Sequence, residues 1–104
     1  MTQKQLNGVT IDIDDEGYMT NHGQWNRDVA AALGKELGIQ LTDGHWRVLD
    51  FIDKDFKERS VVPGMRRMNK IGGIPTKDLY ALFPDGPIKK AARIAGYPKP
   101  VSCV

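Results

Sequence analysis

The sequence predicts a mainly α-helical fold: a compact helical bundle with an N-terminal β-hairpin and a mobile C-terminal arm. Apolar and polar residues alternate near the N-terminus, as they do in strands, and from Trp25 onward apolar residues recur at helical spacing. Two prolines close to the C-terminus exclude a terminal helix. A chain of 104 residues forms one core, so we expect one helical domain over residues 1–96 and a flexible arm over residues 97–104.

The N-terminal hairpin is expected over roughly residues 3–14. Asn7-Gly8 lies between apolar residues, which is the strongest short hairpin signal because both central residues of a type I′ turn need positive φ. The segment from Val9 to Asp14 alternates apolar and polar side chains. A lone hairpin is marginally stable, so we expect this one to pack on the rest of the chain.

Two helices are expected between residues 25 and 59. The first has apolar residues at helical spacing, is weakened by Gly34 and is suited to a C-terminal cap at Gly38. Thr42 is the candidate N-cap of the second helix, which runs to about Arg59. Its apolar face is expected to form the core of the domain, with Trp46, Leu49, Ile52 and Phe56.

Three shorter helices are expected over residues 62–70, 76–83 and 87–95. Pro63 fits the first turn of one, Thr76 can cap the next, and Pro87 starts the last, which Gly96 ends. Met65 and Met68 are expected to face inward, and Leu79, Tyr80 and Leu82 are available for packing. With the helix over 43–59, the first two of these give a helix-turn-helix-like spacing.

The C-terminal arm carries Cys103, the only cysteine of the chain. Pro98 and Pro100 favour an extended course, and the seven steps from Gly96 to Cys103 reach about 20 Å at ~3.1 Å per residue. Chain ends are poorly ordered unless they are tied down. We therefore expect the thiol at the tip of a semi-rigid arm. The alternative is an arm that folds back and places Val101 and Cys103 in a groove.

The chemistry open to one mobile thiol is narrow. A thiolate can attack the sulfur of a persulfide or disulfide on a partner. With no second cysteine, the chain can release a bound sulfur only to a thiol elsewhere. The hypothesis is that Cys103 carries a persulfide. Five side chains are candidates to support the arm or the persulfide anion: Arg66, Lys70, Tyr80, Lys89 and Lys99. The four that are positively charged favour ionisation of the thiol.

We expect no metal and no cofactor. His22 and His45 lack metal-ligand spacing, and there is no phosphate-binding glycine loop. The acidic cluster over residues 12–16 has Gly23 where a calcium loop needs its glutamate. No apolar run approaches the ~18 residues that span a bilayer, and the N-terminus has no signal-peptide stretch. We therefore expect a cytoplasmic protein with no membrane partner.

Two other functions stay open. Residues 61–104 carry a net charge of +6 and residues 1–60 a net charge of −4, so the C-terminal half presents a basic face. With the helix-turn-helix-like spacing, this favours a nucleic-acid-binding regulatory protein, or weak nucleic-acid binding beside another function. The helix over 76–83 offers only Lys77 and Asp78 as polar residues, which is poor for reading bases. The third possibility is a structural subunit that docks through its arm.

The C-terminal third of the chain contains a long motif that resembles a known family. The run Leu79–Ala91, the run Ile94–Pro100 and the penultimate Cys103 strongly resemble the TusE/DsrC family. The resemblance continues upstream through several short matches and covers essentially the whole chain: Gly17-Tyr18, Gln24-Trp25, His45-Trp46 and Pro63 with Arg66 and Lys70. It implies a compact helical fold with an N-terminal hairpin and a mobile arm whose penultimate cysteine, here Cys103, carries sulfur.

The resemblance also implies partners. A TusE-like protein takes persulfide sulfur from a TusBCD-, TusA- or rhodanese-like donor and passes it to an acceptor, such as an enzyme that makes 2-thiouridine in tRNA, or acts in sulfur oxidation. In the DsrC branch, another arm cysteine lies eleven residues before the penultimate one. In this chain that position is Ala92. The chain therefore resembles the single-cysteine TusE-like branch. The segment 69–75 is shorter than is usual in the family.

Overall fold

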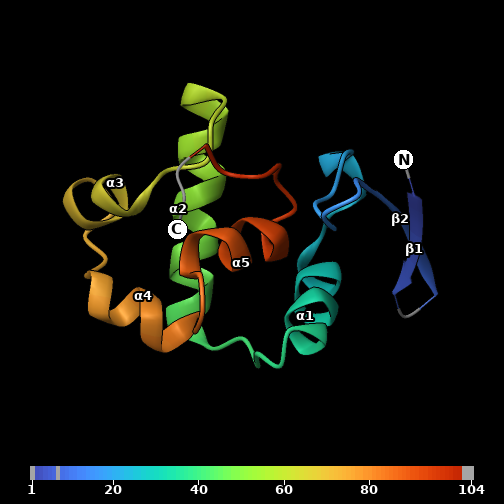
Figure 1. Ribbon diagram of the computed structural model, residues 1–104, viewed down its shortest axis with the longest axis horizontal. Coiled ribbons are helices and arrows are strands. Elements are labelled where there is room, and N and C mark those ends of the chain that lie inside the picture. The colour runs from blue at the N-terminus through green and yellow to red at the C-terminus, as the bar shows by residue number, and fades with distance from the viewer. Residues whose placement is uncertain (1, 7, 102–104) are drawn as a thin grey trace.

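The computed structural model describes residues 2–6 and 8–101, and in this part of the chain a two-stranded hairpin precedes five α-helices (Figure 1). The described chain extends over 37 × 27 × 21 Å. The predicted class, mainly helical with an N-terminal hairpin, is confirmed. Cys103 lies outside the described residues. None of the described helices is both long and apolar enough to cross a membrane.

The hairpin pairs β1 (Thr2–Leu6) with β2 (Val9–Ile13) in antiparallel register, with Leu6 opposite Val9. Leu6 and Ile11 are buried in the common core. Lys4 Nζ lies 2.8 Å from a carboxylate oxygen of Glu36, the last residue of α1 (Arg27–Glu36). The hairpin is therefore held both by apolar burial and by an ion pair, as a marginally stable hairpin requires.

The N-terminus of α2 (Asp43–Arg59) is capped at Thr42, as predicted, and His45 completes the cap. The Thr42 N–H donates to His45 Nδ1 at 3.0 Å, so this nitrogen is an acceptor and the ring proton is on Nε2. His45 Nε2 then donates to the carbonyl of Leu82 at 2.8 Å. One neutral imidazole thus joins the start of α2 to the end of α4 (Thr76–Leu82).

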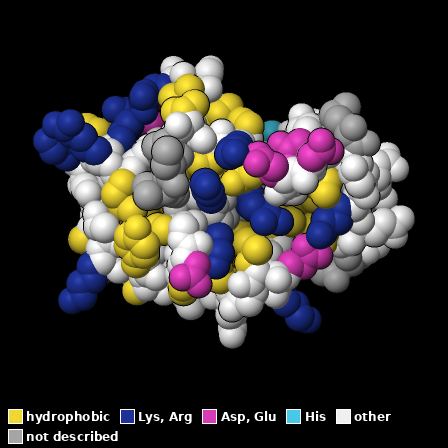
Figure 2. All heavy atoms as spheres, viewed as in Figure 1, with side chains coloured by type: hydrophobic (Ala, Val, Ile, Leu, Met, Phe, Trp, Pro, Cys, Tyr) yellow, Lys and Arg dark blue, Asp and Glu magenta, His cyan; other side chains and the backbone are white. Residues whose placement is uncertain are grey.

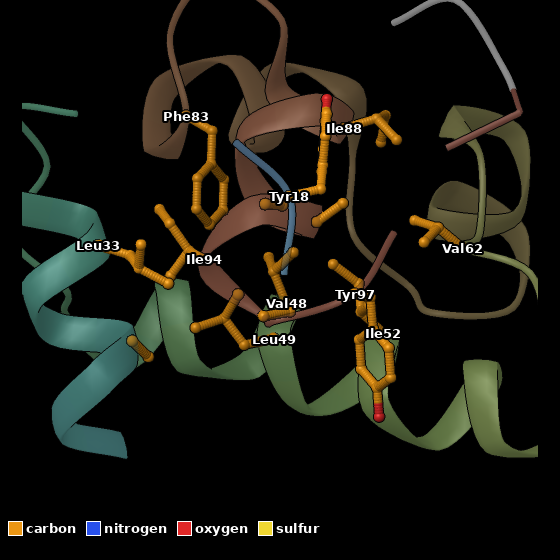
Figure 3. Close-up of a cluster of buried hydrophobic side chains, with 14 of the residues drawn as sticks. Tyr18, Leu33, Val48, Leu49, Ile52, Val62, Phe83, Ile88, Ile94 and Tyr97 are labelled. Atoms are coloured by element: carbon orange, nitrogen blue, oxygen red, sulfur yellow. The ribbon is translucent and has the colours of Figure 1, made fainter. Parts of the chain in front are cut away.

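The core is organised around α5 (Pro87–Ile94), which packs against α1, α2 and α4. Five of its eight residues are buried, and they form one broad apolar face of the helix. Figure 3 shows Ile88 and Ile94 of α5 with Leu33 of α1 and Leu49 of α2. Burial of each such side chain contributes about 1.5–3 kcal/mol to stability. Since three helices pack on α5, it is their main packing partner.

The predicted start of the helix over 62–70 is wrong by three residues, and the predicted cap of the helix over 76–83 is wrong by one. The helix α3 (Met65–Lys70) begins after Gly64, whose extended backbone turns the chain, and Pro63 is buried in the preceding loop instead of in the first turn. In α4 the N-cap is Pro75, because its ring holds φ at −65° with an extended ψ, and Thr76 is the first helical residue. Met68 faces inward as predicted, whereas Tyr80 is 46% exposed.

Candidate functional site

The arm begins at the C-terminus of α5, which ends in a Schellman motif. The Tyr97 N–H donates to the carbonyl of Ala92 at 3.1 Å, and the Gly96 N–H donates to that of Arg93 at 3.2 Å. Gly96 has a φ of +77°, in the left-handed region that this motif requires. The chain therefore turns sharply out of α5.

Two side chains from a distant segment donate to carbonyls at this helix end. Trp25 Nε1 donates to the carbonyl of Ile94 at 2.8 Å. His22 Nδ1 lies 2.9 Å from the carbonyl oxygen of Gly96, so Nδ1 is the donor. His22 belongs to a 3-10 turn (His22–Gln24) that precedes α1. The start of the arm is thus fixed by residues more than 65 positions earlier in the chain.

Tyr97 is buried at the start of the arm, with 3% of its surface exposed. Its ring stacks on His22 at 4.1 Å between centroids and on Phe56 of α2 at 4.3 Å. Its hydroxyl donates to a carboxylate oxygen of Asp53, also on α2. Figure 3 shows Tyr97 among the buried side chains, over α2. The sequence assigned Tyr97 to the arm, but its side chain belongs to the core.

The Tyr97–Asp53 pair keeps defined protonation states. Burial, and then the hydrogen bond to Asp53, raise the pKa of the Tyr97 phenol well above its ordinary value, so it remains a donor. Burial alone would raise the pKa of Asp53, but hydrogen bonds from Tyr97 and Lys57 lower it below its ordinary value. Lys57 Nζ lies 3.0 Å from this carboxylate, and His22 Nε2 lies 3.6 Å from it. The carboxylate is therefore ionised at neutral pH and accepts from the Tyr97 hydroxyl and from Lys57 Nζ.

The described part of the arm continues to Val101. Lys99 Nζ lies 3.0 Å from a carboxylate oxygen of Glu16, and this hydrogen bond raises the pKa of Lys99. Pro100 is buried, whereas Val101 is 82% exposed. The chain is thus held at Tyr97, Lys99 and Pro100 before it reaches the last three residues. The division of the chain into a domain and an arm at residue 96 stays a prediction.

A second feature is a basic hollow of about 340 Å³, lined by Arg59, Gly64, Arg66, Arg67, Lys70 and Ile71. Figure 2 shows Lys and Arg side chains gathered at the upper left, over α3. The side chains of Arg66 and Lys70 are exposed. The hollow brings together two of the residues that the sequence predicted for the site.

Asp55, on α2, orients two of the arginines of this basic hollow. The carboxylate is buried, with 2% of the side chain exposed, and its Oδ1 lies 2.7 Å from Arg67 Nη2 while its Oδ2 lies 3.1 Å from Arg59 Nη1. The hydrogen bond from Arg67 lowers the pKa of Asp55 against the effect of burial, and Arg59 adds to it. Asp55 in turn raises the pKa of Arg67. One buried carboxylate therefore fixes two guanidinium groups beside the exposed Arg66 and Lys70.

Asp55→Asn should lower the free energy of unfolding at pH 7 by about 1–3 kcal/mol, because the variant leaves two guanidinium groups without their buried, charged acceptor. The folded-state pKa of Asp55 is lowered, so its contribution is present above the unfolded value of about 3.9 and is lost as pH falls through the folded value. Denaturant unfolding across pH 2–7 measures this effect. The gap between wild type and variant should be full above about pH 5 and narrow below about pH 4, and a gap that does not change with pH contradicts the assignment.

The other predicted site residues lie apart from the basic hollow. Tyr80 is exposed on α4, Lys89 is exposed on α5, and Lys99 pairs with Glu16. Among residues 2–6 and 8–101, no three His, Asp or Glu side chains gather as metal ligands would. Sequence reasoning missed His22, Asp53 and Tyr97. One signal was available, because an apolar residue directly after a Schellman glycine usually packs back on its helix.

The fold and the site define a small helical protein whose C-terminal segment is anchored in the core, with the single thiol of the chain near its end. The sequence profile described as DsrC like protein matches residues 5–104. The chain belongs to this family, and the resemblance to TusE and DsrC proteins is confirmed.

Relatives match over nearly the full length of both chains. The sulfurtransferase TusE homolog of Haemophilus influenzae is 36% identical, over 95% of this chain and 97% of its own length. Sulfurtransferase TusE of Escherichia coli is 38% identical, over 93% and 95%. The solution structure of Allochromatium vinosum DsrC has a TM-score of 0.80 at 34% identity, over 98% and 97%. Membership of a family with these sulfurtransferases supports a sulfur-relay role.

Proposed function

We propose that this protein is a sulfur carrier that accepts a persulfide sulfur on Cys103 from a donor protein and relays it to an acceptor protein. The observation that carries the proposal is the match to curated sulfurtransferases over nearly the whole chain, within a family profile that extends to residue 104. Since the chain has one cysteine, every sulfur-sulfur bond that it makes must involve Cys103. We also propose a cytoplasmic location, where thiols are kept reduced.

The transfer is an exchange between thiols with no net change in oxidation state. The Cys103 thiolate attacks the outer sulfur of a donor persulfide, the sulfur-sulfur bond of the donor breaks, and the donor leaves as a thiolate. Cys103 then carries the persulfide. A thiolate of the acceptor attacks its outer sulfur in the same way, and Cys103 leaves as a thiolate.

We propose that the charged groups of the basic hollow support this chemistry. A persulfide anion and the acidic surface of a partner both favour positive charge nearby, and Arg66 and Lys70 present it at the basic hollow. We propose that Lys89 and Tyr80 support the arm from α5 and α4. Lys99 has a different role, because its ion pair with Glu16 holds the arm to the domain. The donor is proposed to be TusBCD-, TusA- or rhodanese-like, and the acceptor a tRNA-thiolating enzyme or a protein of sulfur oxidation.

Intact-protein mass spectrometry tests the carrier. The reduced protein is incubated with a persulfide-loaded rhodanese- or TusA-type protein and then mapped to its C-terminal peptide. We expect a gain equal to one or more sulfur atoms on the peptide with Cys103, and its removal by a reducing agent. If no donor of either type loads the protein, the carrier proposal is wrong.

Arg66→Glu should slow sulfur acceptance from a protein donor about three- to ten-fold at low salt, because reversing an exposed charge at an interface mainly changes the rate of encounter. The effect should shrink as salt screens the charges. Lys77→Glu is the matched control, since it makes the same change of charge on an exposed residue of α4, outside the basic hollow. Equal effects of the two variants, measured by stopped-flow or quenched mass spectrometry, would show that only net charge matters.

The basic hollow also favours a second candidate, binding to nucleic acid through phosphates. The described α4 presents few base-reading side chains, so such binding should depend on salt and not on sequence. A salt titration of binding to duplexes of two unrelated sequences measures both dependences. Sequence-specific binding that survives loss of Cys103 would favour the regulatory protein over the carrier.

A further inference from the structure

Tyr97 is held in two ways, by an aromatic stack and by a hydrogen bond from its hydroxyl. The aromatic column of Trp25, His22, Tyr97 and Phe56 is continuous, since His22 stacks on Trp25 at 5.4 Å and on Tyr97 at 4.1 Å. Its polar edge is formed by the Tyr97 hydroxyl, Asp53 and His22 Nε2. Phenylalanine would fill the same space in the column, so the hydroxyl and the carboxylate serve to hold Tyr97 in one position.

The last residue that is held on the domain decides how far Cys103 can reach from it. An extended chain spans at most about 3.3–3.6 Å per residue. With Pro100 held, three residues separate the anchor from Cys103, a reach of about 10 Å. With the chain held only at the end of α5, eight residues separate Ala95 from Cys103, a reach of about 27 Å. Release of Tyr97 together with the contacts of Lys99 and Pro100 that follow it would enlarge the volume accessible to Cys103 by roughly ten-fold or more, and the effective concentration of the thiol at a docked partner would fall accordingly.

We propose that Tyr97 is a positioning residue, and that Tyr97, His22, Phe56 and Asp53 form a latch that fixes the root of the arm and so confines where Cys103 is offered to a partner protein. The part of this inference that concerns transfer rests on the proposed sulfur-carrier function. The latch itself does not, because it is a property of the arm that is measurable without sulfur.

The latch acts on position and not on the chemistry of the thiol. Tyr97 lies six residues before Cys103, and its side chain contacts α2 and the His22–Gln24 turn. Opening it should leave the reaction of Cys103 with a small uncharged reagent unchanged. It should slow the reaction with a docked protein, because there the thiol must meet one fixed target.

Four variants separate the parts of the latch. Tyr97→Phe keeps the stack and removes the hydroxyl, and Tyr97→Leu removes both. Asp53→Asn removes the charged acceptor on α2. Asp50→Asn is the matched control, because Asp50 is an exposed carboxylate on the same helix, one turn earlier, and makes no ion pair or hydrogen bond among the described residues. Circular dichroism checks that each variant is folded at the temperature used.

The position of the arm is measured by pulsed electron paramagnetic resonance between two nitroxide labels. One label is on Cys103, and the other is on a cysteine introduced by Lys54→Cys at an exposed position of α2. We expect the distribution of distances to broaden in Tyr97→Leu and, to a smaller extent, in Tyr97→Phe and Asp53→Asn, and to stay as in the parent for Asp50→Asn. An unchanged distribution in all latch variants would overturn the latch. Since Tyr97→Phe and Asp53→Asn are mild changes, they decide the matter if Tyr97→Leu does not fold.

Sulfur transfer to an acceptor protein is then measured with the same variants, without labels. We expect the maximal rate to fall about ten-fold in Tyr97→Leu and two- to five-fold in Tyr97→Phe and Asp53→Asn, with little change in KM and none in alkylation by iodoacetamide. Broader distances with an unchanged transfer rate would show that the latch does not position sulfur. If the wild type accepts no sulfur, the carrier proposal fails, and the distance measurement alone still decides whether the latch exists.

Discussion

Gly96→Ala should destabilise the protein far more than Gly38→Ala, although the two glycines have nearly the same backbone. Both follow the C-cap of a helix in a Schellman motif, with φ of +77° and +75°. A Cβ at Gly38 would meet no heavy atom within 4 Å, whereas a Cβ at Gly96 would lie 2.5 Å from Trp25 Cδ1 and 2.8 Å from its Cγ. The indole cannot easily move away, because it donates to the carbonyl of Ile94.

The expected magnitudes follow from two separate costs. A left-handed backbone costs alanine about 1–2 kcal/mol at either position. Overpacking at Gly96 adds about 1–3 kcal/mol, for a total of about 2–5 kcal/mol. For a domain near 100 residues, each kcal/mol lowers Tm by about 4–8 °C.

Thermal unfolding followed by circular dichroism measures both variants, with Gly38→Ala as the control for the backbone term. We expect a Tm for Gly96→Ala that is lower than that of Gly38→Ala by at least about 5 °C. Equal losses of Tm would mean that Trp25 does not pack on the end of α5 as described. A larger loss of Tm in Gly38→Ala than in Gly96→Ala would contradict both the backbone and the overpacking argument.

The elements that could be predicted are those whose signals are local. Gly8 gives the hairpin turn, Thr42 the start of α2, and Pro87 with Gly96 the two ends of α5. Each signal is a requirement of the backbone at one position, such as a positive φ or a missing N–H, so a single sequence contains it. Gly34 shows the limit of such reasoning. The sequence indicates a weak point of α1, whereas the structure packs this residue against the carbonyl of Ile39, where a Cβ would approach to 3.0 Å.

The parts of the site that could not be predicted depend on contacts between distant segments. The prolines correctly predict that no helix continues past Gly96, but they cannot show that Tyr97 stacks on His22, 75 positions earlier. Lys99 was expected to help the thiol ionise, and its partner in the structure is Glu16. Both contacts arise because the segment before α1 packs across the end of α5. A pattern of residue types along the chain does not contain that information.

Cys103→Ser should remove sulfur acceptance completely while changing the free energy of unfolding by less than about 0.5 kcal/mol. Serine has nearly the shape of cysteine, but its hydroxyl does not form the persulfide that the proposed exchange requires. Since Cys103 is the only cysteine, no second thiol can replace it. Within residues 2–6 and 8–101, the core is completed by Tyr97, so its stability should not depend on the penultimate residue.

Sulfur acceptance is measured by mass spectrometry after incubation with the donor, and stability is measured by thermal unfolding. Val101→Ala is the matched control. Val101 is exposed and two residues from Cys103, so this change alters the arm without touching the thiol, and sulfur acceptance should persist. Sulfur acceptance by Cys103→Ser would contradict the carrier proposal, because no sulfur-sulfur bond can then form. Loss of acceptance together with a fall in Tm of several degrees would indicate instead that the end of the chain packs on the domain. Loss of acceptance at unchanged Tm supports a carrier role for Cys103, because a purely structural subunit would accept no sulfur even in the wild type.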